Sequence, residues 1–112
     1  MKKIEAIIRP AKVTDVCTAL NKIGHPGIMF TEVEGHGAQH GVEQQFRCKT
    51  YNVELMTKAR LQMIVNDDDV DKTIEAIVGS AHTGEVGDGK IFIYPVADVV
   101  RIRTGQHGAV AV

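Results

Sequence analysis

Residues 83–92, Thr-Gly-Glu-Val-Gly-Asp-Gly-Lys-Ile-Phe, are the stretch of this sequence best suited to hold an anion. Gly87 and Gly89 flank Asp88, and glycines at this spacing let backbone N–H groups converge on a negatively charged group. Lys90 adds a positive charge beside them. We expect a phosphate cradle here, with an ordinary glycine-rich turn as the alternative.

This cradle differs from the P-loop of nucleotide hydrolases. Residues 84–90 satisfy the pattern GxxxxGK, but Ile91 stands where Ser or Thr would hold magnesium. A P-loop also leads from a strand into a helix, whereas this stretch is expected to lead from a helix into a strand. The sequence therefore favours a cradle of another type.

Pairs of basic residues two positions apart form a second signal for phosphate. Arg101 and Arg103 fall in an expected strand, so both side chains would lie on the same face of it. Two adjacent guanidinium groups repel each other unless an anion lies between them, and the planar fork of each can bind two phosphate oxygens. Lys58 and Arg60 repeat this spacing. The structural alternative is pairing with Asp or Glu of a neighbouring strand.

Residues 35–41, Gly-His-Gly-Ala-Gln-His-Gly, form a second glycine-rich segment. Its free backbone amides and the Gln39 carboxamide are expected to line the site of a small polar ligand. His36 and His40 have the spacing of a helical metal pair, but three glycines disfavour a helix. Together with Cys48 they are the basis of an alternative, metal-binding hypothesis.

Composition excludes several classes of function. The 112 residues include 13 Lys and Arg against 14 Asp and Glu, a net charge of -1, so the basic footprint of nucleic-acid binding is missing. No apolar run approaches the roughly 20 residues of a membrane helix. Glu5 and Arg9 come too early for a signal peptide. We expect one cytoplasmic domain, residues 1–112, that neither inserts into membranes nor binds nucleic acid.

The sequence also presents no nucleophile placed beside a base. Cys17 falls on the apolar face of an expected helix, and Cys48 has no histidine at a defined spacing. We therefore expect a protein that is not an enzyme.

Apolar residues recur in the order strand, helix, strand, and this order occurs twice. The expected elements are strands at 3–9 and 28–33 around a helix at 13–23, and strands at 61–65, 91–94 and 99–103 around a helix at 70–81. Such a repeat predicts an α+β, ferredoxin-like sandwich, in which one antiparallel sheet is covered by two helices. Because no helix is left for the other face of the sheet, we expect another subunit to cover it.

The segment between the two halves, residues 36–57, shows little periodicity. Connections of this length are uncommon unless they are functional or disordered. We expect a long mobile loop that contacts another protein.

These residues together resemble the nitrogen regulatory protein P-II family over essentially the whole chain. The similarity begins with residues 2–10, Lys-Lys-Ile-Glu-Ala-Ile-Ile-Arg-Pro, and ends with residues 101–105, Arg-Ile-Arg-Thr-Gly. Residues 83–92 match the C-terminal signature of the family without a gap. The resemblance implies a homotrimer of ferredoxin-like subunits with ATP and ADP as competing ligands in the clefts between them.

The resemblance also implies roles for individual residues. The nucleotide would lie at Met29, Gly35, Gly37, Ala38, Ile64, Gly87, Asp88, Gly89, Lys90, Arg101 and Arg103. The effector 2-oxoglutarate would lie at Gln39, Gly41 and Lys58, and magnesium bound with ATP would be held by Gln39. Tyr51 stands where the family places its uridylylated tyrosine.

The sequence departs from the usual family pattern in places. Residues 46–51 read Phe-Arg-Cys-Lys-Thr-Tyr where the family usually has Tyr-Arg-Gly-Ala-Glu-Tyr. Ala38 replaces a common arginine, and Met29 replaces a threonine near adenine. We therefore interpret the chain as a divergent member, with AMP as a further candidate ligand.

The functional prediction is a nucleotide-responsive signalling protein. Its long loop would regulate a target, such as an ammonium transporter or a metabolic enzyme, in nitrogen or related carbon metabolism. The alternative is a metal- or small-anion-binding trimer of the same architecture.

Overall fold

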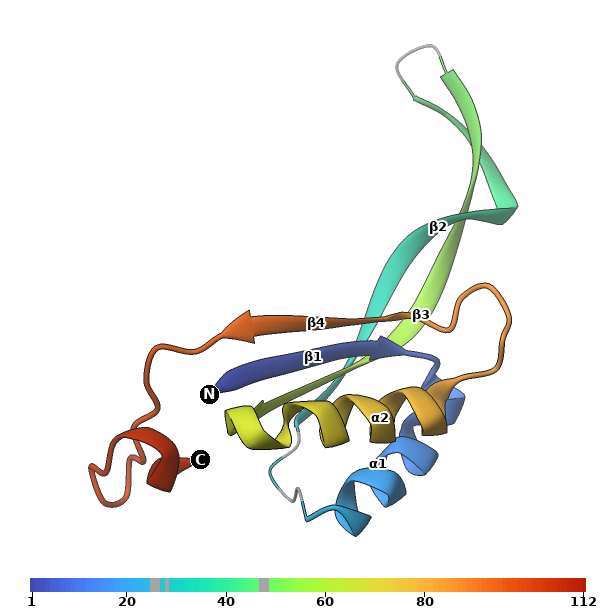
Figure 1. The fold of residues 1–112 in the computed structure, drawn as a ribbon. Coiled ribbons are helices and arrows are strands. Elements are labelled where there is room, and N and C mark those ends of the chain that lie inside the picture. Colours follow the sequence, from blue (N-terminus) through green and yellow to red (C-terminus); the bar gives the residue numbers. More distant parts are fainter. Residues whose placement is uncertain (25–26, 28, 47–48) are drawn as a thin grey trace.

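In the computed structural model, an antiparallel sheet carries helices on one face, and a long arm projects from it (Figure 1). The structure describes residues 1–24, 27, 29–46 and 49–112, and within 29–56 it is described by the backbone alone. The elements are β1 (Lys2–Ile8), α1 (Val13–Lys22), β2 (Met29–Phe46), β3 (Lys49–Val65), α2 (Val70–Ala81) and β4 (Lys90–Pro95).

The strand order is β2-β3-β1-β4, and every neighbouring pair is antiparallel. The unit β1-α1-β2 thus has β3 inserted between its strands, and the unit β3-α2-β4 has β1 inserted between its own. This interleaving is the ferredoxin-like α+β fold, so the fold prediction is confirmed.

The core lies between the sheet and the helices. Alternate residues of β1 and β3 point to the helices because successive strand side chains face opposite sides. The buried apolar residues are Ile4, Ala6, Ile8, Val16, Leu20, Ala59, Leu61, Met63, Val65, Ile77 and Ala81. Both helices begin and end close to the residues predicted from apolar spacing. At the end of α1, Gly24 has a φ of 84° and donates its N–H to the backbone O of Asn21 at 3.1 Å, the expected glycine stop.

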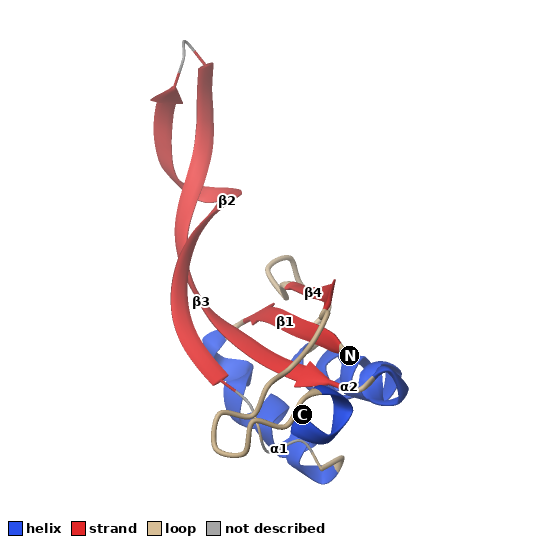
Figure 2. Cartoon of the chain, turned by 90° about the vertical axis from the view of Figure 1, so that its left-hand side faces the viewer, coloured by secondary structure: helices blue, strands red, loops and turns tan. Residues whose placement is uncertain are grey.

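The opposite face of the sheet is not covered by any helix of the described residues (Figure 2). Lys3 and Glu5 lie on this face of β1 and are half-buried. They are in register with Tyr94 and Phe92 of β4, which are both 43% exposed. The expectation of an open face on a single chain is therefore met.

The prediction of an aperiodic loop over residues 36–57 is wrong. The described part of this segment belongs to β2 and β3, which pair from Met29 with Gln62 to Phe46 with Lys49 and form the arm of Figure 1. Tyr51, Val53 and Leu55 alternate with polar residues, which is the period of a strand. The glycines at 35–41 interrupt this period in the sequence, which is why the strand is expected to end near Gly35. In the structure, β2 continues past Gly35 to Phe46.

The predicted strand at 99–103 is also not formed. An extended segment needs a partner for its backbone groups, and this one leaves the sheet after β4 and closes on itself. Arg101 donates its N–H to the O of Gln106 at 2.9 Å, Gly105 donates to the O of Arg101 at 2.7 Å, and Val100 bridges His107.

None of the described residues belongs to a helix long and apolar enough to cross a membrane.

Candidate functional site

The loop between α2 and β4 is organised around the carboxylate of Asp88. Its Oδ2 accepts hydrogen bonds from the backbone N–H groups of Thr83 and Gly84, each at 2.9 Å. Its Oδ1 accepts from the Thr83 hydroxyl and, at 3.2 Å, from Nε of Arg9. Asp88 therefore holds the loop closed from inside, with both carboxylate oxygens accepting hydrogen bonds from the protein itself.

These donors also fix the charge of Asp88. The hydrogen bond from the Thr83 hydroxyl, followed by those from the backbone of the loop and from Arg9, holds the pKa of Asp88 well below the usual range of aspartate. The carboxylate is therefore ionised at neutral pH, and its negative charge is already met by donors.

Arg9, directly after β1, ties this loop to the sheet. Its Nη2 donates to the backbone O of Val86 at 2.8 Å, in addition to the Nε contact with Asp88. The ammonium of Lys58 on β3 donates to the backbone O of Gly87. Arg9 and Lys58, which come from neighbouring strands, therefore both hold the predicted anion-binding loop in place.

The glycines of the loop are required by its shape. Gly87 and Gly89 have φ values of 103° and 101°, in the region that disfavours residues with a side chain. A Cβ on Gly87 would lie 3.3 Å from the Arg9 guanidinium. Glycine therefore permits both the turn and the close approach of the loop to Arg9.

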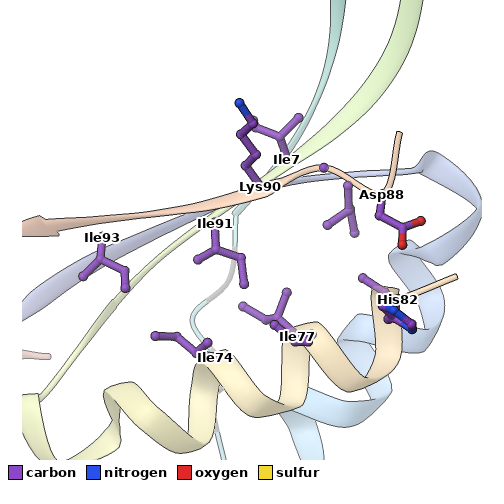
Figure 3. Close-up of a pocket in the computed structure, with 12 residues that line it drawn as sticks. Ile7, Ile74, Ile77, His82, Asp88, Lys90, Ile91 and Ile93 are labelled. Atoms are coloured by element: carbon purple, nitrogen blue, oxygen red, sulfur yellow. The ribbon is translucent and has the colours of Figure 1, made fainter. Parts of the chain in front are cut away.

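An apolar cavity of about 400 Å³ lies beside the loop, between α2 and β4. In Figure 3, Ile74 and Ile77 of α2 face Ile91 and Ile93 of β4 across it, whereas the Lys90 side chain points to the other side of the strand. The lining is mainly aliphatic, so this cavity is unsuited to phosphate. The side chains of Lys58 and Lys90 instead lie on the face of the sheet opposite to this cavity.

The structure thus brings five of the predicted site residues together at one end of the sheet. They are Lys58, Gly87, Asp88, Gly89 and Lys90. Ile64 lies further along β3 and is half-buried on the open face, in register with Lys3.

The predicted arginine pair lies away from these five residues. Arg101 and Arg103 follow the far end of β4, whose six residues span roughly 17 Å at about 3.3 Å per residue. The guanidinium of Arg101 donates to Oε1 of Gln106 at 3.2 Å and to the O of Val110 at 3.0 Å. Arg103 is exposed in a turn. The prediction that both project from one face of a strand is wrong, because no strand forms there.

The remaining predicted residues belong to the arm. The backbones of Met29, Gly35 and Gly37 pair with Gln62, Met56 and Glu54 of β3. Ala38, Gln39 and Gly41 lie where the register shifts, between Gly37 and Val42, at the bend of β2 visible in Figure 1. Tyr51 is paired with Gln44. Cys48 lies outside the described residues.

Reasoning from sequence missed Arg9 as a site residue. Its position after a strand and before Pro10 suggested only a strand end. The available signal for Arg9 was an arginine directly before a proline, at the end of an expected strand. Nothing in the spacing pointed to its partner Asp88, 79 residues later.

Comparison with known proteins decides the family. The family model for the nitrogen regulatory protein P-II matches residues 1–106. The chain belongs to the P-II family. Nitrogen regulatory protein P-II 2 of Methanothermobacter thermautotrophicus is 50% identical over 112 residues, which cover 100% of this chain and 97% of that relative. The P-II protein of Azospirillum brasilense is 47% identical and P-II 1 of Escherichia coli 45%, with full coverage of both chains in each case.

The P-II family consists of nitrogen regulatory signal-transduction proteins, so the resemblance seen in the sequence is confirmed at this level. Among the residues that the structure describes, no group of three or more His, Cys, Asp or Glu could hold a metal ion.

Proposed function

We propose that this P-II protein is a homotrimer that binds ATP or ADP, or AMP, between its subunits and reports the bound ligand to a target protein through the β2-β3 arm. The observation that carries the proposal is the division of the phosphate-binding residues. The loop at Gly87–Lys90 and the pair Arg101 and Arg103 lie beyond opposite ends of β4. One phosphate chain can contact both groups when they come from different copies.

The open face of the sheet supports the trimer. Glu5, Phe92 and Tyr94 leave a mixed aromatic and charged surface, with the aromatic rings 43% exposed. The Nε of Arg60 on this face is buried without a hydrogen-bond partner in the described residues. A buried donor without a partner destabilises the fold. An acceptor from a second copy of the chain would give Arg60 Nε a partner and remove this cost.

The chemistry of the site follows from its donors. The N–H groups around Gly87 and Gly89 and the ammonium of Lys90 would bind phosphate oxygens, and the arginines of the neighbouring copy would bind the remaining ones. Met29, Gly35, Gly37, Ala38 and Ile64 would line the rest of the nucleotide site. Magnesium bound with ATP would be held by Gln39.

The effector 2-oxoglutarate would bind at Gln39, Gly41 and Lys58. Lys58 already contacts the loop at Gly87, so an effector carboxylate that attracts its ammonium would compete with this contact. A ligand can shift the arm only through different affinities for its two arrangements. The register shift between Gly37 and Val42 adjoins the effector residues and provides a point where the arm can change.

The proposed target is an ammonium transporter or a metabolic enzyme, contacted by the arm in the cytoplasm, with Tyr51 as a modification site on the arm. The protein itself is proposed to bind nucleotides without turning them over, since Asp88 is saturated by donors and is not available as a base.

Calorimetry tests the binding. Purified protein is titrated with ATP, ADP and AMP, each with and without magnesium and 2-oxoglutarate. We expect micromolar binding of at least one nucleotide, and Lys90→Ala should weaken it. Absence of binding at millimolar nucleotide would refute the proposal.

A further inference from the structure

The segment that follows β4 is closed by one carboxylate. Asp98 Oδ2 lies 2.7 Å from Nδ1 of His107. Its Oδ1 accepts hydrogen bonds from the backbone N–H of Val99 at 2.8 Å and of Gly108 at 3.1 Å. Asp98 therefore joins the start of the segment to a point ten residues later.

Arg101 is held inside the closed segment. Its guanidinium donates to the side chain of Gln106 and to the backbone O of Val110, and its own O accepts from the N–H of Gly105. Gln106 and Val110 lie directly around the closure at His107 and Gly108. The acceptors of Arg101 stay in place only while the segment stays closed.

We propose that Asp98 and His107 form a latch that keeps Arg101 from phosphate. Both are positioning residues, since they act through Arg101. The inference rests on the proposed nucleotide site, to which Arg101 contributes. A phosphate chain has to displace Gln106 and Val110 from the guanidinium, so the closed segment lowers the fraction of binding-competent protein and with it the apparent affinity.

Asp98 closes the segment as an anion. The hydrogen bond from His107 holds the pKa of Asp98 below its usual range. At neutral pH both of its oxygens are therefore available as acceptors, Oδ2 beside Nδ1 of His107 and Oδ1 for the backbone N–H groups of Val99 and Gly108.

The charged groups around the latch are few. Within the described residues, the polar contacts of Asp98 and His107 are with each other and with their own segment. Val99 and Ala111 share a cavity with Lys3 of β1 and with Asp69 and Lys72 at the start of α2. Asp69 and Lys72 form an ion pair at 3.0 Å, and Lys3 lies 3.7 Å from Glu5. In the described part of the chain, no ion pair joins these groups to Asp98 or His107.

His107→Ala in the full chain separates the latch from simple electrostatics. Loss of a hydrogen-bond donor near the site would weaken the binding of an anion, whereas opening of the latch strengthens it. We expect His107→Ala to bind ATP more tightly than the wild type, on the order of threefold to tenfold. Asp98→Asn should act in the same direction.

Asp71→Asn is the matched control, because it removes an exposed carboxylate on α2 and leaves the segment intact. It should bind ATP as the wild type does. Amide hydrogen exchange gives a readout that needs no nucleotide: Gly105 and Gly108 should exchange faster in His107→Ala and unchanged in Asp71→Asn.

The outcomes separate the two claims. If the wild type and all variants bind no nucleotide, the proposed function fails and the latch, which depends on it, fails with it. If the wild type binds ATP but His107→Ala binds it equally or more weakly, only the latch is overturned.

Discussion

Gly89 lies so close to β1 that a Cβ atom on it would be 1.7 Å from the backbone O of Ile7. The proposed phosphate-binding loop is therefore pressed against the strand at a residue whose side chain is only a hydrogen. Together with the grip of Arg9 on Val86 and Asp88, this contact fixes the loop before any ligand arrives. A loop held in this way loses little conformational entropy when it binds an anion.

The first prediction concerns Gly89→Ala. A methyl group cannot occupy the position of the Ile7 O, so β4 has to move away from β1, and the positive φ adds strain of about 1–3 kcal/mol. We expect a loss of more than about 2 kcal/mol in the free energy of urea unfolding and a loss of nucleotide binding. Gly84→Ala is the control: its φ is also positive, at 88°, but its Cβ would meet only His82 at 3.8 Å. Equal destabilisation by both variants would contradict the contact argument.

The second prediction concerns acid stability. Because the pKa of Asp88 is lowered in the folded chain, its stabilising effect is complete above the ordinary aspartate pKa of about 4 and is lost as the pH falls toward the folded value. We expect the wild type to lose stability relative to Asp88→Asn as the pH falls from 5 to 2. Unfolding followed by circular dichroism measures this difference. Asp68→Asn, which changes an exposed carboxylate in the short turn before α2, serves as the control. A difference between wild type and Asp88→Asn that does not change with pH would refute the assignment.

The sequence predicts the ferredoxin-like fold because both helices and the inner strands carry clear apolar periods. Ile4, Ala6 and Ile8 alternate at the period of a strand, and Val16 and Leu20 recur at the period of a helix. Such patterns arise because these residues are buried against a core formed by the same chain. They can therefore be recognised in a single sequence.

The errors fall where the deciding contacts are not local. The arm at 36–57 is held by pairing between β2 and β3, and its glycines disguise the alternation that Tyr51, Val53 and Leu55 display. The segment at 99–103 reads as a strand, yet none of the described strands pairs with it, and the contact of Asp98 with His107 closes it instead. Likewise, the spacing of Gly87 and Gly89 predicts a turn around Asp88 but not the donors of Thr83 and Arg9 that surround its carboxylate in the folded loop.

The third prediction separates binding from stability at Arg103. Because this side chain is exposed in a turn, Arg103→Ala should change the free energy of unfolding by no more than about 0.5 kcal/mol. Loss of a charged hydrogen bond to phosphate, worth about 1.5–3 kcal/mol, should weaken nucleotide binding by roughly tenfold to 150-fold. Calorimetry and urea unfolding on the same preparation measure both quantities, with Lys22→Ala at the exposed end of α1 as the control. Unchanged affinity in Arg103→Ala would remove this residue from the site.

The last prediction tests whether one nucleotide is shared between subunits. Lys90→Ala damages the loop of a subunit and leaves its arginines intact, whereas the double variant Arg101→Ala, Arg103→Ala does the reverse. Each variant alone should bind nucleotide weakly at all its sites. In a mixed trimer, an intact loop meets intact arginines at one interface, whichever variant is in the majority. Unfolding and refolding the two variants together should therefore restore a fraction of sites with wild-type affinity, measured by calorimetry, while simple mixing of folded trimers should not. If refolded mixtures bind no better than the separate variants, the loop and the arginines act within one chain, and the division of the site between copies is wrong.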